Sequence, residues 1–390
     1  MSSASASASA STYSARVREW VALAATPGLG PTRTKRLLER FADVGRIFAA
    51  SLTELEAAGL PAVSAQAIAL GASLQAADAE LDKAQAAGAR LLVPDDPAYP
   101  RQLLEIYDPP AVLYVVGEAE CLSLPGIAIV GTRHPTPYGI GMAERLACDL
   151  AARGLIIFSG MARGIDSAAH RGALNTKGRT VAVFGTGVDV IYPRENRKLA
   201  EQILAHGGAL VSEFPIGTAP TPQNFPIRNR VISGLAQGVL VSEAGEYSGT
   251  RITARCALEQ GREVFAVPGN VTNKLAWGPN TLIKQGGKLV ATWEDVWEEL
   301  PAEVRARVEA LTPPLPDAPK TGSLFEQSLP EGNEKKVFAL VKADEAVHID
   351  ELMEKLEGSL SSSEVFAALF ELELAGRIRQ LPGKNYVRSF

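Results

Sequence analysis

The segment LIIFSGMARGID (residues 155–166) decides the fold of this chain. Its first part, Leu155–Phe158, is a short apolar run of the kind that forms a β-strand. The second part, Ser159–Asp166, contains small residues and two glycines, which allow a tight turn and bring backbone amides close to a ligand. A helical pattern follows at once. A strand, a glycine-containing turn and a helix in this order predict one unit of a parallel α/β sheet.

The same alternation continues on both sides of this segment. Further strands are predicted over Arg90–Val93, Val112–Val116, Ile127–Val130, Thr180–Phe184, Ala209–Val211, Gly238–Val241, Glu263–Ala266 and Lys288–Val290. Helical patterns lie between most of them, and such alternation is typical of sheets whose helices cover both faces. We therefore predict an α/β domain over residues 88–300, built on a doubly wound, mostly parallel sheet.

The flanking segments have different patterns. Residues 12–87 carry Ala- and Leu-rich helical runs and predict a helical domain. Residues 301–333 are rich in Pro, Gly and Ser, which predicts a linker. Residues 334–390 predict winged-helix order, with helices and then a hairpin over 334–342, 349–357, 361–375, 377–381 and 386–388. Residues 1–11 alternate Ser and Ala and lack the parts of a secretory signal, so a disordered tail is predicted.

The composition excludes several classes of protein. Hydrophobic residues make up 46% of the chain, enough for large buried cores, and the net charge of −5 gives no overall attraction to nucleic acid. Any phosphate site must therefore be a local concentration of charge. Cys121, Cys148 and Cys256 form no CxxC pair and fit a reducing cytoplasm. The histidines show no metal-ligand spacing, and no run is long and apolar enough to span a membrane.

Polar motifs follow several predicted strands at the point where each strand ends. Residues 131–133 follow one strand, residues 159–166 a second and residues 242–250 a third. Ligands of such sheets bind beyond the carboxyl ends of the strands. Each segment has small residues that let amides approach a ligand, and each leads into a helix N-terminus, which favours negative charge. Three such loops at one edge predict an anion-binding site.

The segment FPIRNR (residues 225–230) adds the groups that hold a single-stranded nucleic acid. Phe225 offers a face on which a base can stack. Arg228 and Arg230 offer planar, permanently charged forks that match phosphate oxygens. The alternative is a solvated basic helix start, with Phe225 packed on the core.

A second basic segment lies in the helical domain. TPGLGPT (residues 26–32) joins two helical patterns and precedes several basic residues. Such a turn resembles a helix-hairpin-helix, which presents amides and basic side chains to phosphate. Gly28, Gly30, Lys35 and Arg36 are therefore predicted as a secondary DNA contact. An ordinary pair of helices with a solvated face shows the same pattern, so this alternative stays open.

No catalytic residue, metal or cofactor is predicted. The sequence G-x-x-x-x-G-K-[ST] is absent, and the loop at Gly131 lacks G-x-G-x-x-G, so neither a nucleoside-triphosphate engine nor a dinucleotide site is expected. Asp166 could act as a general base, but its position favours a helix N-cap. Glu243 and Glu246 could pair as acid and base, yet no nucleophile or metal ligand lies near them. His170, one helical turn after Asp166, is interpreted as a packed or surface histidine.

Together, the motifs closely resemble those of the DNA-processing protein A (DprA, or Smf) family. The resemblance covers most of residues 88–300 and is carried by Ser159–Asp166, Phe225–Arg230, residues 243–244 and 248–250, and GREVFAVPG at residues 261–269. It implies an extended Rossmann-like fold that binds single-stranded DNA as a homodimer. It also implies that the protein loads RecA recombinase onto DNA coated with single-strand binding protein, in natural transformation and recombination.

The resemblance also implies which residues contact DNA. Matched to the family's motifs, they are Arg133, Gly160, Phe225, Arg228, Asn229, Arg230, Ser248, Gly249 and Thr250. The N-terminal domain resembles the family's sterile-alpha-motif-like domain, and the C-terminal domain resembles its winged helix. In that domain the helix that usually reads duplex DNA, Ser361–Ala375, has only acidic charges. A protein-contact role is therefore expected for the winged helix.

An enzyme class with the same type of sheet is the alternative. Cytokinin-activating nucleotide phosphoribohydrolases carry a loop of the form P-G-G-x-G-T-x-x-E, whose Glu takes part in the chemistry. In this chain Glu243-Ala244-Gly245 replaces the first part of that loop, and Thr253 stands where the Glu would be. The missing acid favours a binding protein over an enzyme.

Overall fold

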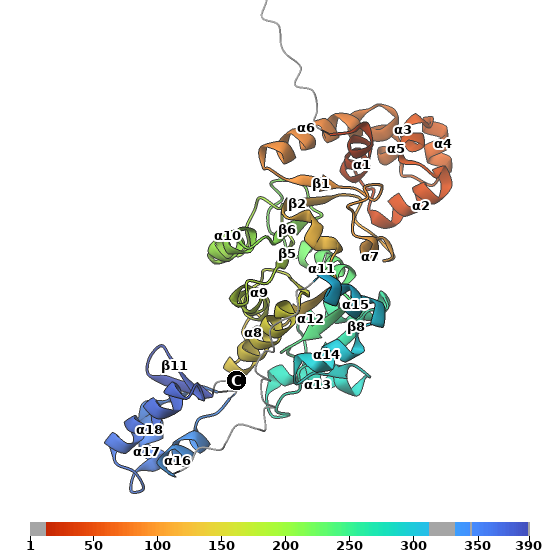
Figure 1. Ribbon diagram of the computed structural model, residues 1–390. Coiled ribbons are helices and arrows are strands. Elements are labelled where there is room, and N and C mark those ends of the chain that lie inside the picture. The colour runs from red at the N-terminus through yellow and green to blue at the C-terminus, as the bar shows by residue number, and fades with distance from the viewer. Residues whose placement is uncertain (1–12, 312–331, 344, 389–390) are drawn as a thin grey trace, which may run out of the picture.

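The computed structural model describes residues 13–311, 332–343 and 345–388. The predicted tail at residues 1–11 lies outside the described residues, as does most of the predicted linker. Figure 1 shows an elongated molecule with a helical unit at one end, a sheet covered by helices in the middle, and a small separate unit at the other end. In the part of the chain that the structure describes, no helix is long and apolar enough to cross a membrane.

The N-terminal unit is a bundle of short helices. They are α1 (Ala15–Ala25), α2 (Pro31–Phe41), α3 (Val44–Ala49), α4 (Leu52–Ala57), α5 (Ala62–Ala69) and α6 (Ala72–Ala86). Trp20 and Leu37 are buried between them, and the same core continues onto Phe184 of the sheet. Glu80 of α6 accepts a hydrogen bond from the backbone of Ile216 at 2.7 Å, so the bundle is also joined to the sheet by polar contact.

Internal hydrogen bonds hold the turn between α1 and α2. Gly28 has a φ of +73°, a conformation that favours glycine. Pro31 begins α2. Proline is tolerated there because the first N–H groups of a helix have no partner within the helix. The Arg33 guanidinium donates to the carbonyl of Gly28 at 2.6 Å, and the Ser64 hydroxyl donates to the carbonyl of Pro27 at 2.7 Å. The structure therefore has the two helices and the tight turn that the sequence predicts.

A nine-stranded sheet forms the centre of the molecule, and it has a strand at every predicted position. The strands are β1 (Arg90–Leu92), β2 (Leu113–Gly117), β3 (Gly126–Val130), β4 (Ile156–Ser159), β5 (Thr180–Phe184), β6 (Ala209–Ser212), β7 (Gly238–Val241), β8 (Glu263–Ala266) and β9 (Lys288–Leu289). Their order is β1-β2-β6-β5-β4-β3-β7-β8-β9. From β6 to β9 all neighbours are parallel, whereas β1 and β2 pair antiparallel. The predicted fold class is confirmed.

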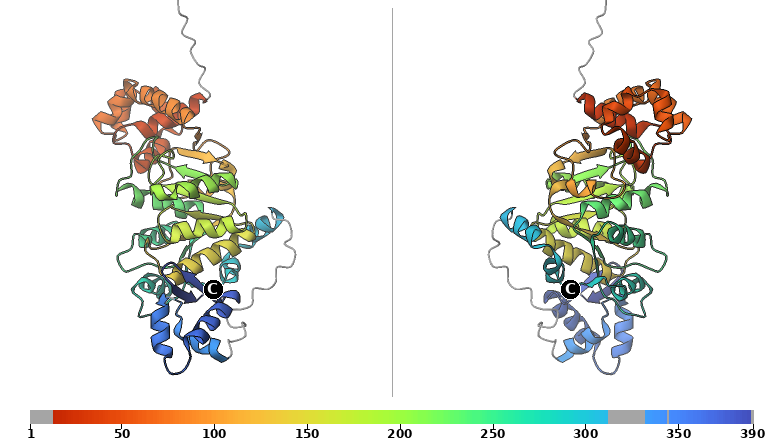
Figure 2. Two further views of the ribbon diagram at one scale, coloured as in Figure 1. Left: turned by 90° about the vertical axis from the view of Figure 1, so that its left-hand side faces the viewer. Right: turned by 90° about the vertical axis from the view of Figure 1, so that its right-hand side faces the viewer.

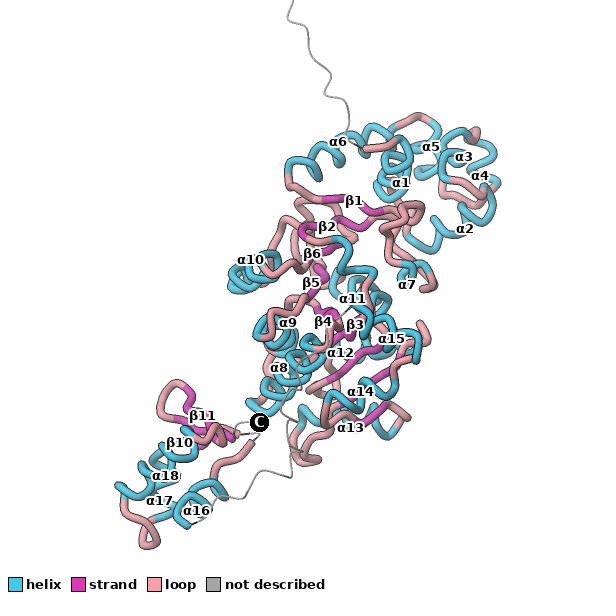
Figure 3. The backbone as a smooth tube through the Cα atoms, in the orientation of Figure 1, coloured by secondary structure: helices cyan, strands magenta, loops and turns pink. Residues whose placement is uncertain are grey.

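Helices cover both faces of this sheet, as the tube in Figure 3 shows. On one face lie α8 (Pro137–Ala152), α9 (Ile165–Asn175) and α10 (Arg197–Ala205); on the other lie α11 (Asn224–Leu235), α12 (Thr250–Glu259) and α13 (Trp277–Lys284). Between β3 and β7 the strand order reverses, because the chain crosses to the other face through α11. This reversal is the switch point at which open α/β sheets form a ligand crevice.

Shorter elements complete the central unit. They are α7 (Arg101–Leu104), the 3₁₀ turns at Ala119–Ser123, Arg194–Asn196 and Lys274–Ala276, and the helices α14 (Trp293–Glu299) and α15 (Ala302–Leu311). The start of the predicted linker is therefore helical. Val308 of α15 is buried in the core beneath α8 and α14, a contact that composition alone does not indicate. We propose that the central domain extends from residue 88 to Leu311.

The C-terminal unit has the winged-helix order that the sequence predicts. Its elements are α16 (Gly332–Leu340), β10 (Val347–His348), α17 (Ile349–Leu356), α18 (Ser362–Leu374), β11 (Ile378–Leu381) and β12 (Asn385–Arg388). The short strand β10, which the sequence analysis missed, pairs with β12. Val365, Leu369 and Leu372 of α18 are buried in the core of this unit.

A buried histidine lies within the central unit. The Thr180 hydroxyl donates to the carbonyl of Ile157 at 2.5 Å, so it accepts from Nδ1 of His170, which lies 2.7 Å away. Burial lowers the pKa of His170 to about 3, and the neighbouring charges of Arg171 and Arg228 add to this shift. The imidazole is therefore neutral in the folded protein and belongs to the packed interior.

This histidine predicts a pH dependence of stability. In the unfolded chain a histidine takes up a proton below about pH 6.5, whereas folded His170 does so only near pH 3. The unfolded state binds the extra proton between these values, so the free energy of unfolding falls as the pH falls. From pH 7.5 to 5.5 the loss due to His170 is about 1.4 kcal/mol. Urea unfolding of His170→Gln should show a pH dependence smaller by that amount, and equal dependence in both chains would contradict it.

Candidate nucleic-acid interface

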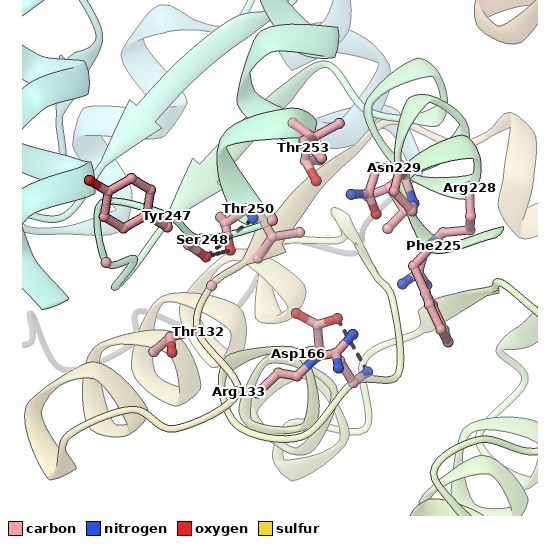
Figure 4. Close-up of a pocket in the computed structure, with 18 of the residues that line it drawn as sticks. Thr132, Arg133, Asp166, Phe225, Arg228, Asn229, Tyr247, Ser248, Thr250 and Thr253 are labelled. Atoms are coloured by element: carbon pink, nitrogen blue, oxygen red, sulfur yellow. Dashed lines mark hydrogen bonds between the residues drawn. The ribbon is translucent and has the colours of Figure 1, made fainter. Parts of the chain in front are cut away.

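A cleft of about 870 Å³ opens at the carboxyl ends of β3 and β7, at the switch point of the sheet. The loops at residues 131–134 and 245–249 form two of its walls, and the starts of α9, α11 and α12 complete it (Figure 4). The sequence predicted a site at this edge from the same three loops. The structure brings the three loops together with the first turns of α11.

Two aromatic rings and one guanidinium form a platform at one end of the cleft. The ring centroids of Tyr192 and Phe225 lie 5.7 Å apart at an interplanar angle of 37°. The exposed guanidinium of Arg133 lies 5.5 Å from the centre of the Phe225 ring. Phe225 is packed against the backbone at Gly185, where a Cβ would come within 2.8 Å of its ring. A cation and two ring faces at one place suit a base and its phosphate.

The other wall of the cleft is the N-terminus of α12. The hydroxyl of Ser248 accepts from the backbone N–H of Thr250 at 3.2 Å and donates to the Thr250 hydroxyl at 2.9 Å, so this side chain bonds the first residue of the helix, whose N-cap is Gly249. Gly249 is exposed, and a Cβ there would have no atom within 4 Å. The helix dipole makes this end of α12 favourable for an anion.

Arg228 is part of the lining of the cleft, but its guanidinium is bonded inside the protein. Its side chain is buried, and Nη1 donates to the carbonyl of Gly160 at 2.6 Å and to the carbonyl of Val183. Burial lowers the pKa of this guanidinium to about 10, and the carboxylate of Asp166 opposes the shift. Gly160 leaves the space that this arrangement needs, since a Cβ there would lie 2.5 Å from Nη1. The guanidinium is therefore used inside the protein.

Arg230 also has internal partners. Nη2 lies 2.5 Å from a carboxylate oxygen of Glu213, and Nε lies 3.1 Å from one of Asp108. It is buried and does not line the cleft, whereas Asn229, next to it in the sequence, does. The sequence predicted that the guanidinium groups of Arg228 and Arg230 would be free to bind phosphate, but both make internal contacts. The exposed cation of the cleft is Arg133.

The carboxylates near the cleft hold the backbone in place. Asp166 is the second residue of α9, not its N-cap, which is Gly164. Its carboxylate accepts from the N–H of Ala162 at 3.2 Å, and burial raises its pKa although Arg228 acts against this. The N-cap prediction is wrong because the cap position falls two residues earlier, on a glycine with a φ of +75°.

Glu243 has a similar structural role. Its carboxylate accepts from the N–H of Thr136 at 2.8 Å and from the Thr136 hydroxyl at 2.6 Å, and so it ties β7 to the start of α8. Gly139 fits against this carboxylate, since a Cβ there would lie 2.3 Å from it. Glu243 and the exposed Glu246 therefore do not form an acid and base pair. Thr253, where a phosphoribohydrolase would carry its acid, is buried at the edge of the cleft.

Comparison with known proteins agrees with this architecture. Residues 90–301 match the model of the family described as DNA recombination-mediator protein A. The chain belongs to this family. Residues 313–384 match the DprA winged helix domain.

Relatives in the family span much of the chain. Protein Smf of Escherichia coli is 44% identical over 299 residues, which cover 76% of this chain and 77% of that protein. The DNA processing protein DprA of Bacillus subtilis is 49% identical over 204 residues, 52% of this chain and 68% of that protein. The X-ray structure of DNA processing protein A from Streptococcus pneumoniae matches with a TM-score of 0.65 and 35% identity, over 73% of this chain and 98% of that one.

The secondary contact predicted in the helical domain is separate from the cleft. None of Gly28, Gly30, Lys35 and Arg36 lines it. The ammonium of Lys35 donates to the carbonyl of Tyr107 at 3.2 Å and lies 5.2 Å from the centre of that ring, whereas Arg36 is exposed. Among the residues that the structure describes, no group of three His, Cys, Asp or Glu side chains could hold a metal ion.

Sequence reasoning missed Tyr192 as a site residue. It is 42% exposed and forms half of the aromatic platform. The segment between β5 and the 3₁₀ turn at Arg194–Asn196 brings it to Phe225. Its one signal in the sequence is its place in the loop that follows β5, because ligands of such sheets bind beyond the carboxyl ends of the strands.

Proposed function

We propose that this chain binds single-stranded DNA in the cleft at the switch point of the sheet. The observation that carries the proposal is the platform of Tyr192, Phe225 and Arg133 beside the N-terminus of α12. Stacking needs unpaired bases, because in a duplex both faces of each base are already stacked. The contacts are to ring faces and phosphates, so little sequence preference is expected.

The proposed contacts are those at the surface of the cleft. They are Arg133, Tyr192, Phe225, Asn229, Ser248, Gly249 and Thr250. For Gly160, Arg228 and Arg230 we propose a supporting role, since their polar groups face the interior. A weaker contact at Gly28, Gly30, Lys35 and Arg36 stays part of the proposal.

Membership of the family supports a wider role. We propose that the chain acts as a homodimer, and that it loads RecA recombinase onto DNA coated with single-strand binding protein during transformation and recombination. The family name, DNA recombination-mediator protein A, supports this role. The test is RecA-dependent strand exchange on coated DNA. The parent chain should shorten the lag before strand exchange begins, and the Phe225→Ala chain should not. An unchanged lag with the parent chain would contradict the loading role.

A binding role also agrees with the chemistry of the cleft. Buried Thr253 stands where a phosphoribohydrolase loop carries its acid. The carboxylate of Glu243 already accepts two hydrogen bonds from Thr136. Incubation with nucleoside monophosphates should therefore release no free base. Release that is lost on mutation of this chain would favour the enzyme.

Arg133→Ala should weaken single-strand binding for all sequences alike and reduce its salt dependence. Each phosphate contact on a single strand contributes about 0.7 to the slope of log K against log salt. Fluorescence anisotropy with a labelled oligonucleotide across a salt series measures both quantities. Arg163→Ala is the matched control, because this exposed arginine is paired with Glu195 at 2.7 Å outside the cleft. An unchanged slope for Arg133→Ala would remove it from the phosphate contacts.

Removal of the winged helix should leave single-strand binding nearly intact. A chain ending at Leu311 keeps α15, whose Val308 belongs to the core of the central unit. The charges of α18 are acidic and would repel a phosphate backbone. Affinity for a labelled oligonucleotide should stay within a few-fold of the full chain. A loss of about 100-fold, or 2.7 kcal/mol, would place DNA contacts on this domain.

A further inference from the structure

Helix α18 of the winged-helix unit exposes a row of large apolar side chains. Phe366, Phe370 and Leu374 are 50%, 62% and 75% exposed. They are spaced four residues apart, so they lie on one face of the helix. Their spacing covers eight residues, or about 12 Å along the axis. The opposite face already supplies the core of the unit through Leu369 and Leu372, so packing inside the unit does not explain this row.

The charges beside this row decide what kind of partner it suits. Glu371 and Glu373 lie on the exposed side of α18, one on each side of the row. In most winged helices this helix enters the major groove of DNA, for which two carboxylates and two phenyl rings are unsuited. The surface fits an apolar groove with basic residues at its rim.

This chain has such a groove between α12 and α13. It has a volume of about 410 Å³ and is lined by Ile252, Leu258, Trp277 and Leu282, with Arg251 and Arg255 on its rim. Leu258 is 59% exposed and Trp277 is 38% exposed. The Arg251 guanidinium lies 5.2 Å from the centre of the Trp277 ring and donates to the carbonyl of Glu246. Nε of Arg255 lies 3.4 Å from a carboxylate oxygen of Glu259.

We propose that the apolar row of α18 docks into the α12–α13 groove of a second copy of this chain. The apolar row faces the apolar floor, with Glu371 opposite Arg255 and Glu373 opposite Arg251. The dimensions agree, because the α12 side of the groove runs from Arg251 to Leu258, about 10 Å. The contact uses the helix-in-groove mode, in which residues four apart anchor an amphipathic helix.

The position of α15 favours a second copy over the chain's own winged helix. Val308 packs on the face of the sheet that carries α8 and α14, whereas the groove belongs to the face that carries α12. In both views of Figure 2, α15 (blue) and the teal helices α12 and α13 lie at opposite lateral edges of the central unit. The chain therefore leaves the central unit on the side away from its own groove. A two-fold exchange gives both copies the same contact and closes the assembly.

The contact specifies one interface of the proposed homodimer, and so it rests on that part of the proposed function. It also lies next to the proposed DNA site, because the groove and the cleft share Tyr247 and Ser248 in their linings. A winged helix of one copy would thus border the strand that the other copy holds.

A photo-crosslink at Phe370 tests the contact in the full chain. Benzoylphenylalanine replaces Phe370, and ¹⁵N-labelled and unlabelled chains are mixed before irradiation. The expected products are mixed-isotope peptide pairs that join α18 to α12 or α13. Products of a single isotope only, products at another surface, or no products would each overturn the proposal. Benzoylphenylalanine at Leu70, 79% exposed on the helical domain, is the matched control and should give none of these pairs.

A charge exchange adds a second test. Glu371→Arg and Arg255→Glu should each reduce the mixed crosslink about tenfold, since each places like charges together. Mixing the two variants should restore the crosslink, because in that heterodimer both contacts again pair opposite charges. Failure to recover on mixing would overturn the proposal. Single-strand affinity is measured on the same chains, so a failed contact is distinguishable from a failed DNA site.

Discussion

Arg228→Ala should lose about 3–5 kcal/mol of its free energy of unfolding, the cost of leaving a buried charge without its partner. The guanidinium is buried and donates to the carbonyls of Gly160 and Val183. Its positive charge also interacts favourably with the negative charge of the Asp166 carboxylate. Its removal leaves a buried carboxylate and two buried carbonyls without that donor. A loss of this size is a large part of the stability of an ordinary domain.

Urea unfolding with a fluorescence signal measures this loss. Arg163→Ala is the control, because its ion pair with Glu195 is exposed and screened by water, so its loss should change stability little. Adding Asp166→Asn to Arg228→Ala should recover part of the loss, since the uncompensated carboxylate is then gone. If Arg228→Ala unfolds like the parent but binds single strands far more weakly, Arg228 contacts phosphate directly and its supporting role is wrong.

The position of every strand of the central sheet could be predicted from the sequence because each is a short apolar run between helical patterns. Loop positions followed from the same reasoning, since parallel strands end at one edge of a sheet. Helix α15 could not be predicted, because it lies at the start of a window rich in Pro and Gly. Only its packing through Val308 shows that it belongs to the central core.

The FPIRNR segment shows where sequence reasoning about a site stops. Phe225, Arg228, Asn229 and Ile232 are spaced as one face of a helix, and all four line the cleft. The same spacing places Arg230 on another face, so its absence from the cleft was predictable from helical phase. The burial of Arg228 was not, because it depends on Gly160 and Asp166, which come from another βα unit.

Tyr192 could not be assigned to the platform from the sequence. Its ring lies 5.7 Å from Phe225, although the two residues lie in different segments of the chain. Local propensity carries no information on such a pair. The side chains that form the platform thus come from two loops and the first turn of α11, and only Phe225 belongs to a motif with an evident stacking role.

Phe225→Ala should weaken binding of single-stranded DNA about 10- to 100-fold. Stacking on an aromatic ring contributes about 1–3 kcal/mol per base, and about 1.4 kcal/mol corresponds to a tenfold change. Phe225 also supports its neighbours, since Tyr192 and the Arg133 guanidinium both lie against its ring. Phe225→Trp keeps a ring face and should bind within a few-fold of the parent.

The salt series separates this effect from that of Arg133. A ring carries no charge, so Phe225→Ala should lower the affinity at every salt concentration and leave the slope of log K against log salt unchanged. Arg133→Ala should lower the slope by about 0.7. Leu70→Ala, an apolar change on the helical domain outside the cleft, should alter neither quantity. If Phe225→Ala binds single strands as tightly as the parent, the bases stack elsewhere and the platform is not the DNA site. If it lowers duplex and single-strand binding equally, the ring supports the fold of the cleft and does not select unpaired bases.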